Sequence, residues 1–193
     1  MARPREFDID EILYQVMEIF WKEGYEKTSF ALIEEQTGVK KASLCAAFGD
    51  KRSLFLKALR HYQEVGRQAC QLALNQGGPD LVIRQWVSQI AENTIGENAG
   101  QGCMHVNTII ELAARDAEVA ALVREHTELI SAHVAEVIIK GQRSGQFRTD
   151  VKATALATYL VTSVYGLVVV GKAAAVGKDM KQIVNVILSG LEK

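Results

Sequence analysis

Residues 28–59 constrain the fold of this chain more than any other stretch, because they hold three helical segments in very little sequence. Gly38 marks a tight turn between two short helical segments, and Asp50 opens a longer third one. Leu44 and Phe48 are four residues apart, so they fall on one face of the second short helix. Two helices joined at a steep angle by a turn that contains glycine form a helix-turn-helix. This stretch therefore predicts a small helical unit built around that motif.

The outward face of the second short helix carries small or cationic side chains. These are Lys40, Lys41, Ala42, Ser43, Cys45 and Ala46. A helix that enters the major groove of DNA needs such a face. Lys51 follows Asp50 in the first turn of the next helix, where backbone N–H groups and an ammonium together suit a phosphate. We therefore expect this face and Lys51 to contact DNA.

Charge is distributed unevenly around this unit. The whole chain carries 22 Lys+Arg and 23 Asp+Glu, so its net charge of −1 gives no sign of a nucleic-acid partner. Residues 36–62 hold mostly cations: Lys40, Lys41, Lys51, Arg52, Lys57 and Arg60, against Asp50 alone. Residues 6–35 instead hold nine acids against Lys22 and Lys27. One interpretation is a basic DNA-binding surface with acids behind it, which would orient the protein on the phosphate backbone. The alternative is that these lysines form an ordinary solvated helix face.

A set of short motifs runs through residues 8–60: Ile12-Leu13, Phe20, Glu23-Gly24-Tyr25, Thr28-Ser29, Thr37-Gly38-Val39, Ser43-Leu44, Phe48-Gly49-Asp50-Lys51 and Leu54-Phe55. This combination resembles the N-terminal DNA-binding domain of TetR-family transcriptional regulators. A later set resembles one branch of that family: Gly102-Cys103, Asn107, Glu111-Leu112 and Arg115-Asp116. The resemblance implies an all-α fold of about nine helices, with a three-helix helix-turn-helix DNA-binding domain at residues 1–60. A ligand-binding and dimerisation domain would follow at residues 61–193, and Thr28 would be a further DNA contact.

Two positions depart from the family's usual pattern. Cys45 stands where the family usually has Tyr or another aromatic residue that contacts the DNA backbone. Lys40 stands where the family usually has Ser or Thr as the N-cap of the reading helix. Lysine cannot accept the capping hydrogen bond, and its charge lies beside the positive end of the helix dipole. A DNA phosphate at this point would make sense of that pairing.

Residues 1–7 form a short arm whose cations are Arg3 and Arg5. Such an arm can reach the minor groove or a phosphate, and a frayed terminus with two incidental arginines is the alternative. The arm has no apolar run of the kind that a secretory signal needs. The three cysteines are widely spaced, so they suit neither a disulfide framework nor a paired metal site. We therefore expect a cytoplasmic protein.

Helical patterns cover most of the remaining chain. A first helix from Asp8 to Gly24 would brace the reading unit, and the helix opened by Asp50 would run to Asn75 as a lever between two domains. A clear break at residues 76–80 follows. Further helices are expected at about residues 80–95, 103–114, 116–144, from 150 onward, and over 183–191.

The run between Lys152 and Lys172 holds 19 residues without a charge, close to the length of a membrane span. Threonines, tyrosines and glycine dilute its hydrophobicity, and an exposed uncharged helix face in a soluble chain marks an interface. TetR-like proteins dimerise through their last two long helices. The resemblance therefore implies a homodimer through residues 152–172 and 183–191, which we favour over a membrane span. Gly166 and Gly171 would permit close helix approach.

The resemblance also implies a ligand-responsive regulator, expected to be a repressor that binds a palindromic operator as a homodimer. A small-molecule or oxidant inducer in the C-terminal domain would alter the spacing of the reading heads and release the DNA. Candidate ligand-binding residues are Trp86, Cys103, Met104, Asn107, Glu111, Tyr159 and Tyr165. Cys103 follows Gly102 at a predicted helix start, where a thiolate is stabilised, so it is also a candidate sensor. A small half-buried residue at a tight turn is the alternative.

Other classes of function are weaker on the sequence. It contains no glycine-rich phosphate loop, nucleophile elbow or HExxH motif, so we expect neither an enzyme nor a cofactor. His126 and His133 are seven residues apart, yet no third ligand completes a metal site. The departures at Cys45 and Lys40 keep one alternative open. It is an all-helical dimeric adaptor, or a thiol-based redox sensor, with weakened DNA binding.

Overall fold

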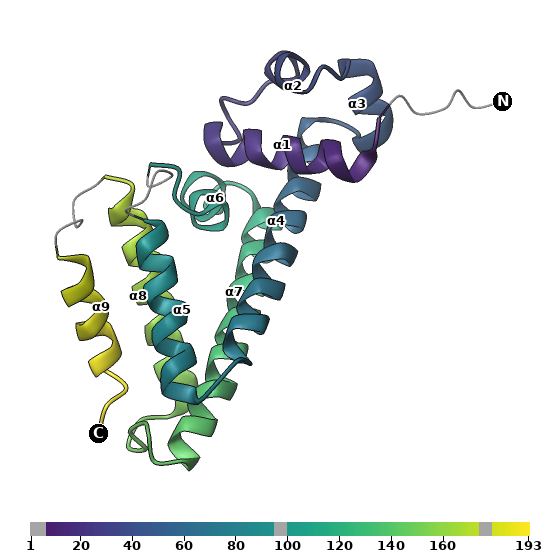
Figure 1. Cartoon of the computed structure of the whole chain (residues 1–193). Helices are drawn as coiled ribbons and strands as arrows, with labels where there is room; N and C mark the ends of the chain where they lie inside the picture. The colour runs from purple at the N-terminus through teal and green to yellow at the C-terminus, as the bar shows by residue number, and fades with distance from the viewer. Residues whose placement is uncertain (1–6, 95–99, 174–178) are drawn as a thin grey trace.

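The computed structural model describes residues 7–94, 100–173 and 179–193 (Figure 1). Within these ranges the chain forms helices and no strand. In chain order they are α1 (Ile9–Glu23), α2 (Phe30–Thr37), α3 (Lys41–Phe48), α4 (Lys51–Leu74), α5 (Pro79–Asn93), α6 (Met104–Leu112), α7 (Ala117–Arg143), α8 (Ala153–Gly171) and α9 (Met180–Ser189). The predicted all-α fold with an N-terminal helix-turn-helix is confirmed.

The first three helices and the start of α4 form a compact head (Figure 1). Phe20 of α1 and Phe55 of α4 pack edge to face with ring centroids 5.1 Å apart, and Leu44 of α3 is fully buried above them. The same apolar core includes Met104 and Leu112 of α6 and the start of α7. Burial of these side chains supplies most of the driving force that fixes the head on α6.

Helix α4 joins this head to the rest of the molecule. Asp50 caps it by accepting a hydrogen bond from the Ser53 N–H at 2.7 Å, and it continues for 24 residues to Leu74. Its first turns contact α1 and α3, and its later turns contact α5 and α7. The predicted long helix from Asp50 to Asn75 is thus present. The expected boundary between the two domains, at residues 60 and 61, falls inside this helix.

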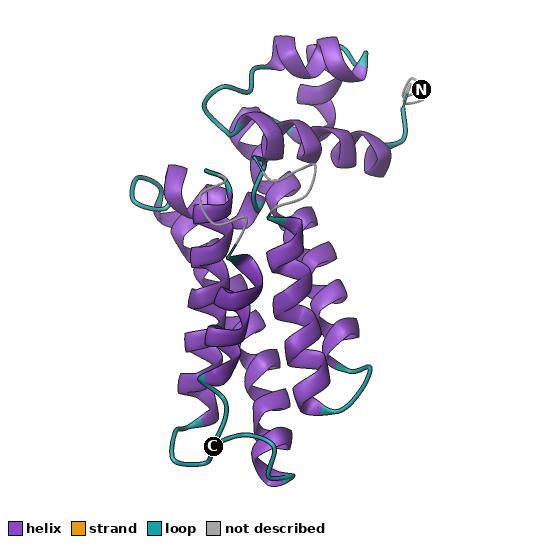
Figure 2. Cartoon of the chain, turned by 60° about the vertical axis from the view of Figure 1, so that its left-hand side comes forward, coloured by secondary structure: helices purple, strands orange, loops and turns teal. Residues whose placement is uncertain are grey.

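Helices α5, α7, α8 and α9 pack with the end of α4 into a second bundle (Figure 2). Its central side chains include Val87, Val134, Leu160 and Val161, all fully buried. Gly171 serves this packing within the chain. A Cβ at Gly171 would lie 2.6 Å from the Thr94 Cβ, so glycine lets the end of α8 approach the end of α5.

The start of α8 differs from the prediction. The helix begins at Ala153, whereas Asp150 forms an ion pair with Arg148 at 2.7 Å. The Gln142 side-chain amide donates to the carbonyls of Arg148 and Val151 at 2.8 and 2.9 Å. These bonds hold the segment before α8 in a non-helical path. By length and composition α8 alone among the described helices could cross a membrane, but one side of it packs on α5 and α7.

Candidate nucleic-acid interface

The turn between α2 and α3 is built from local hydrogen bonds. Gly38 takes the left-handed conformation with φ of 71°, which glycine adopts without steric cost, and its N–H donates to the Glu34 carbonyl at 2.9 Å. The Thr37 hydroxyl donates to the Ile33 carbonyl at 2.7 Å and accepts from the Val39 N–H at 3.2 Å. These bonds end α2 and fix the direction in which α3 starts.

Helix α3 presents the face that the sequence predicts. Leu44 and Phe48 are buried in the head, whereas Lys41, Ala42 and Ala46 are exposed. Ser43 and Cys45 are half-buried at the edges of the exposed face. The outward side of α3 is therefore short, smooth and free of acidic side chains. A base-pair edge could approach its backbone closely.

The N-terminus of α3 is capped by Glu34, a residue of α2. One carboxylate oxygen of Glu34 accepts from the Lys40 ammonium at 2.7 Å, and the other accepts from the Lys41 N–H at 2.9 Å. These bonds hold the pKa of the Glu34 carboxyl below its usual value. As its chemistry predicts, the Lys40 side chain makes no capping hydrogen bond, and in the unbound protein Glu34 supplies both the cap and the negative charge.

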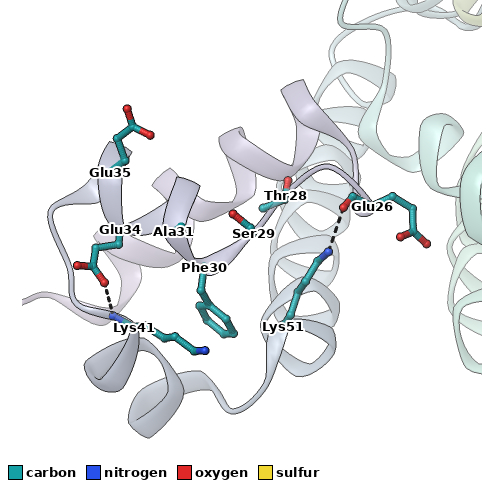
Figure 3. A pocket seen from close by; sticks show the side chains of 9 residues that line it. All are labelled: Glu26, Thr28, Ser29, Phe30, Ala31, Glu34, Glu35, Lys41 and Lys51. Carbon is teal, nitrogen blue, oxygen red and sulfur yellow. Dashed lines mark hydrogen bonds between the residues drawn. The ribbon is translucent and has the colours of Figure 1, made fainter.

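A groove of about 720 Å³ lies between α2, α3 and the start of α4 (Figure 3). Its lining residues are Glu26, Thr28, Ser29, Phe30, Ala31, Glu34, Glu35, Lys41 and Lys51. Three of these are acids, so the acids do not all lie behind the basic reading element as the charge pattern suggested. The helical path brings carboxylates and ammonium groups to the same groove.

Lys51 and Thr28 are tied to this head by specific contacts. The Lys51 ammonium donates to the Glu26 carbonyl at 3.3 Å and lies 4.4 Å from the centre of the Tyr25 ring. Thr28 is fully buried, and its hydroxyl donates to the Gly24 carbonyl at 2.6 Å. The Thr28 side chain thus fastens the loop between α1 and α2. Arg3 and Arg5 lie outside the described residues.

The residues predicted to bind an inducer do not converge on one pocket. Trp86 and Met104 are buried in two different cores, and Tyr159 donates from α8 to the Ile187 carbonyl at 3.1 Å. Asn107 donates to the Gln101 carbonyl and accepts from the Lys172 ammonium, both at 2.9 Å. Each of these side chains therefore has a structural contact of its own.

Two further members of that set lie at the junction with the head. Glu111 accepts from the N–H groups of Tyr25 and Glu26 at 3.0 and 2.9 Å. Cys103 is the N-cap residue of α6, and its sulfur accepts from the Tyr62 hydroxyl at 3.4 Å. Burial raises the pKa of Tyr62, so the phenol keeps its proton as a donor. Both residues thus have hydrogen-bond partners at this junction.

The structure instead gathers a buried polar network that the sequence did not reveal. Gln63 of α4 lies 3.1 Å from His105 Nδ1, and His105 Nε2 lies 3.1 Å from the Thr127 hydroxyl of α7. The Tyr165 hydroxyl of α8 is 3.4 Å from the same Thr127 oxygen, and the His126 ring lies 4.7 Å from that of His105. Four helices thus contribute to one network, and Tyr165 is its only member from the predicted set.

Burial fixes the protonation state of this network. It lowers the pKa of His105 to about 3, so the ring is neutral at pH 7. The Gln63 amide then donates to Nδ1, which assigns the remaining proton to Nε2 and directs it to Thr127. The Thr127 hydroxyl in turn donates a hydrogen bond to the Val123 carbonyl at 2.9 Å. Across residues 7–94, 100–173 and 179–193, no three His, Cys, Asp or Glu side chains cluster as metal ligands.

Comparison with known families agrees with this architecture. Residues 12–58 match the family described as bacterial regulatory proteins, tetR family, and residues 81–187 match the tetracyclin repressor-like C-terminal domain. The first match covers α1 to the start of α4, and so includes the helix-turn-helix. The second covers most of the chain from α5 to α9.

Individual relatives share the full length of the chain. The HTH-type transcriptional repressor ComR of Escherichia coli is 25% identical over 189 residues, which is 97% of this chain and 90% of ComR. The uncharacterized HTH-type transcriptional regulator YezE of Bacillus subtilis is 27% identical and covers 100% of both chains. Among solved structures, a cysteine mutant of the TetR family regulator CifR in complex with 26 bp operator DNA superposes with a TM-score of 0.79. It is 26% identical and covers 98% of this chain and 100% of its own. This chain belongs to the TetR family of DNA-binding transcriptional regulators.

Proposed function

We propose that this protein is a repressor that binds a palindromic operator as a homodimer and is released by a small-molecule effector. The outward face of α3 carries the proposal. Its exposed residues Lys41, Ala42 and Ala46 leave the backbone accessible to base edges. Such a protein would work in the cytoplasm, where the DNA lies. The operator complex of CifR supports the same use of this fold.

An uncharged face on α8 supports the homodimer. Its exposed residues are Thr154, Ala155, Thr158, Tyr159, Thr162, Gly166, Val169 and Val170. The hydroxyls of Thr158 and Thr162 donate to carbonyls of their own helix, so they do not oppose burial. Val186 of α9 is 67% exposed. A second copy covering this face would place two α3 helices on a two-fold axis, about 34–36 Å apart or a multiple of that.

The network around His105 is the best candidate for the effector site. It joins α4, which carries the head, to α6, α7 and α8. A ligand with a hydrogen-bonding group could replace Gln63 or Thr127 as the partner of His105. Such a ligand would favour release of the DNA only to the extent that it binds the released conformation more tightly than the DNA-bound one.

Cys103 supports a second route to the same response. Cys103 is half-buried at the start of α6, and the carbonyl of the preceding Gly102 accepts from the Trp21 indole of the head at 3.0 Å. Oxidation at Cys103 would remove the Tyr62 hydrogen bond and disturb this junction. If thiol labelling of the folded protein leaves Cys103 unmodified, this route is excluded.

The decisive experiment measures fluorescence anisotropy of labelled DNA from upstream of the protein's own coding region. Saturable binding that survives excess unrelated duplex and weakens steeply with salt is expected for a specific regulator. Equal, weak binding to every duplex would call for selection from a fragment library. An empty selection would favour the adaptor alternative.

A matched pair of variants tests the role of α3. Ala42→Glu places a carboxylate on the exposed face of α3, and Ala132→Glu makes the same change on the exposed face of α7. We expect Ala42→Glu to weaken binding at least about tenfold by repulsion from phosphate, with little change for Ala132→Glu. Equal affinities for the two variants would show that α3 does not contact the DNA.

A further inference from the structure

Glu111 reaches from α6 to the loop between α1 and α2 and binds its backbone with both carboxylate oxygens. Oε2 accepts from the Tyr25 N–H at 3.0 Å, and Oε1 accepts from the Glu26 N–H at 2.9 Å. Hydrogen bonds to an ionised carboxylate are stronger than those between neutral groups. Two successive N–H groups of the head are therefore held by one side chain of the C-terminal domain.

Gly24 is shaped for this contact. Its φ of +81° is a conformation that other residues rarely adopt, and a Cβ there would lie 3.1 Å from Glu111 Oε2. The Gly24 carbonyl also accepts from the buried Thr28 hydroxyl at 2.6 Å. The N–H groups of the loop are thus bound to α6, and its Gly24 carbonyl is bound within the loop by Thr28, two residues before α2.

The same loop holds Lys51, a cation that lines the groove between α2, α3 and the start of α4. The carbonyl of Glu26 accepts from the Lys51 ammonium at 3.3 Å, and the Tyr25 ring lies 4.4 Å from that nitrogen. Figure 3 shows Lys51 reaching across the groove to Glu26. A displacement of the loop would therefore move both groups that locate the Lys51 ammonium.

We propose that Glu111 is a positioning residue through which α6 sets the place of Lys51 on the DNA-binding face. This inference rests on the proposed function for its effect on DNA, whereas the contacts themselves can be tested without DNA. Glu111 acts through the backbone of residues 25 and 26 and does not itself touch DNA.

Neighbouring contacts make α6 well suited to this role. The Trp21 indole donates to the Gly102 carbonyl just before α6, and Arg52 donates three hydrogen bonds of 3.0 Å to the Asp116 carboxylate just after it. Within α6, His105 belongs to the buried network. A shift of α6 caused by rearrangement of that network would thus act on the head at Glu111, between two flanking attachments.

The first test compares amide hydrogen exchange of Tyr25 and Glu26 in the full-length protein and in Glu111→Gln. Glutamine keeps one acceptor oxygen but turns its NH₂ group towards the other N–H. We expect exchange at these amides to become at least about tenfold faster, as loss of a charge-assisted hydrogen bond implies. Glu125→Gln removes the same charge from the exposed face of α7 and should leave exchange unchanged. Circular dichroism checks that both variants are folded.

The second test combines Glu111→Gln with Lys51→Ala and measures affinity for a duplex that the unaltered protein selects from a random library. Each single change should weaken binding by about three- to tenfold, and the second change should add less than about twofold to the first, because they act through one contact. Additive effects would overturn the proposed link to Lys51, and unchanged exchange in Glu111→Gln would overturn the clamp itself. If the unaltered protein selects no duplex, the proposed function fails and the exchange comparison alone decides the inference.

Discussion

His105 of α6 contacts side chains from three other helices, and burial lowers its pKa to about 3 from an ordinary value of 6.5. The neighbouring His126 ring acts in the same direction, and burial lowers its own pKa as well. The unfolded chain therefore binds a proton at His105 at a higher pH than the folded protein does. The contribution of the neutral His105 ring to the free energy of unfolding is therefore largest above about pH 6.5, and it is lost as the pH falls towards 3.

This titration predicts a measurable loss of stability at mildly acidic pH. Between pH 6.5 and 5.5 the free energy of unfolding should fall by about 1 kcal/mol from His105, and faster below that. Urea unfolding at fixed protein concentration measures it. His105→Gln cannot titrate, so its stability should depend less on pH over this interval. An identical pH dependence in that variant would contradict the neutral buried ring.

Gly141 illustrates a different constraint at the level of one residue. It lies inside α7, where alanine would normally be favoured by about 1 kcal/mol. A Cβ at this position would overlap the Phe147 ring, which packs on the helix after the turn.

We expect Gly141→Ala to destabilise the protein by up to about 2 kcal/mol, because overpacking outweighs helix propensity. Gly66→Ala is the matched control, since Gly66 is exposed in α4 with open space around its Cα. That change should be neutral or stabilising by up to about 1 kcal/mol. Thermal unfolding of both variants decides the comparison, and equal melting temperatures would refute the overlap.

At the scale of elements, α2 and α3 depend on each other through Glu34. The helix dipole of α3 needs a negative partner at its start, and Lys40 brings a positive one. The Glu34 carboxylate supplies that partner and holds the Lys40 ammonium at 2.7 Å. When DNA binds, a phosphate would have to compete with Glu34 for the Lys40 ammonium.

Glu34→Gln should therefore change the salt dependence of DNA binding. Glutamine can still accept from the Lys41 N–H, but it no longer neutralises Lys40. If Lys40 then pairs with a phosphate, the slope of log affinity against log salt steepens by about 0.9. Glu35→Gln alters an exposed acid of the same groove and helix and serves as the control. Equal slopes for the two variants would show that Glu34 does not restrain Lys40.

For the whole molecule, the uncharged outward face of α8 and the exposed Val186 of α9 underlie the proposed assembly. Val186 is 67% exposed, and Tyr159, Val169 and Val170 are about two-fifths exposed. Exposed apolar side chains on these two helices favour an interface there. The head alone offers one short reading helix, so an assembly of two copies would double the base contacts.

If the proposed homodimer forms through this face, Val186→Glu should yield a monomer in analytical ultracentrifugation and weaken binding to a palindromic duplex at least about tenfold, because half of the contacts are lost. Leu72→Glu is a matched control on the outer side of α4, where Leu72 is 63% exposed. It should leave both properties unchanged. A Val186→Glu protein that remains dimeric would place the interface elsewhere.

The helices of this protein follow closely from its sequence. Asp8 accepts from the Asp10 and Glu11 N–H groups, Asp50 from Ser53, and Asp116 from Glu118 and Val119, each within three residues. Gly24 and Gly38 end the first two helices where the pattern predicts. Caps and apolar periodicity depend on neighbours within about one helical turn, so they can be read directly along the chain.

The positions of the candidate functional side chains could be predicted from the sequence only in part. The exposed face of α3 is correctly predicted because it is the complement of Leu44 and Phe48 on a single helix. The buried state of Thr28 and the capping role of Glu34 are not, because each depends on the angle between neighbouring elements. The proposed inducer residues are polar, aromatic or sulfur-containing, but nothing in one sequence reports which of them face each other.

The sequence by itself therefore determined the helices, the turn at Gly38 and the reading face of α3. Only the tertiary structure decided that Glu111 binds the backbone 86 residues away at Tyr25, and that Gln63 meets His105 across 42 residues of chain. The physical reason is range. Backbone hydrogen bonds and caps within a helix are local, whereas a side chain's partner on another helix depends on how the buried faces of both helices pack.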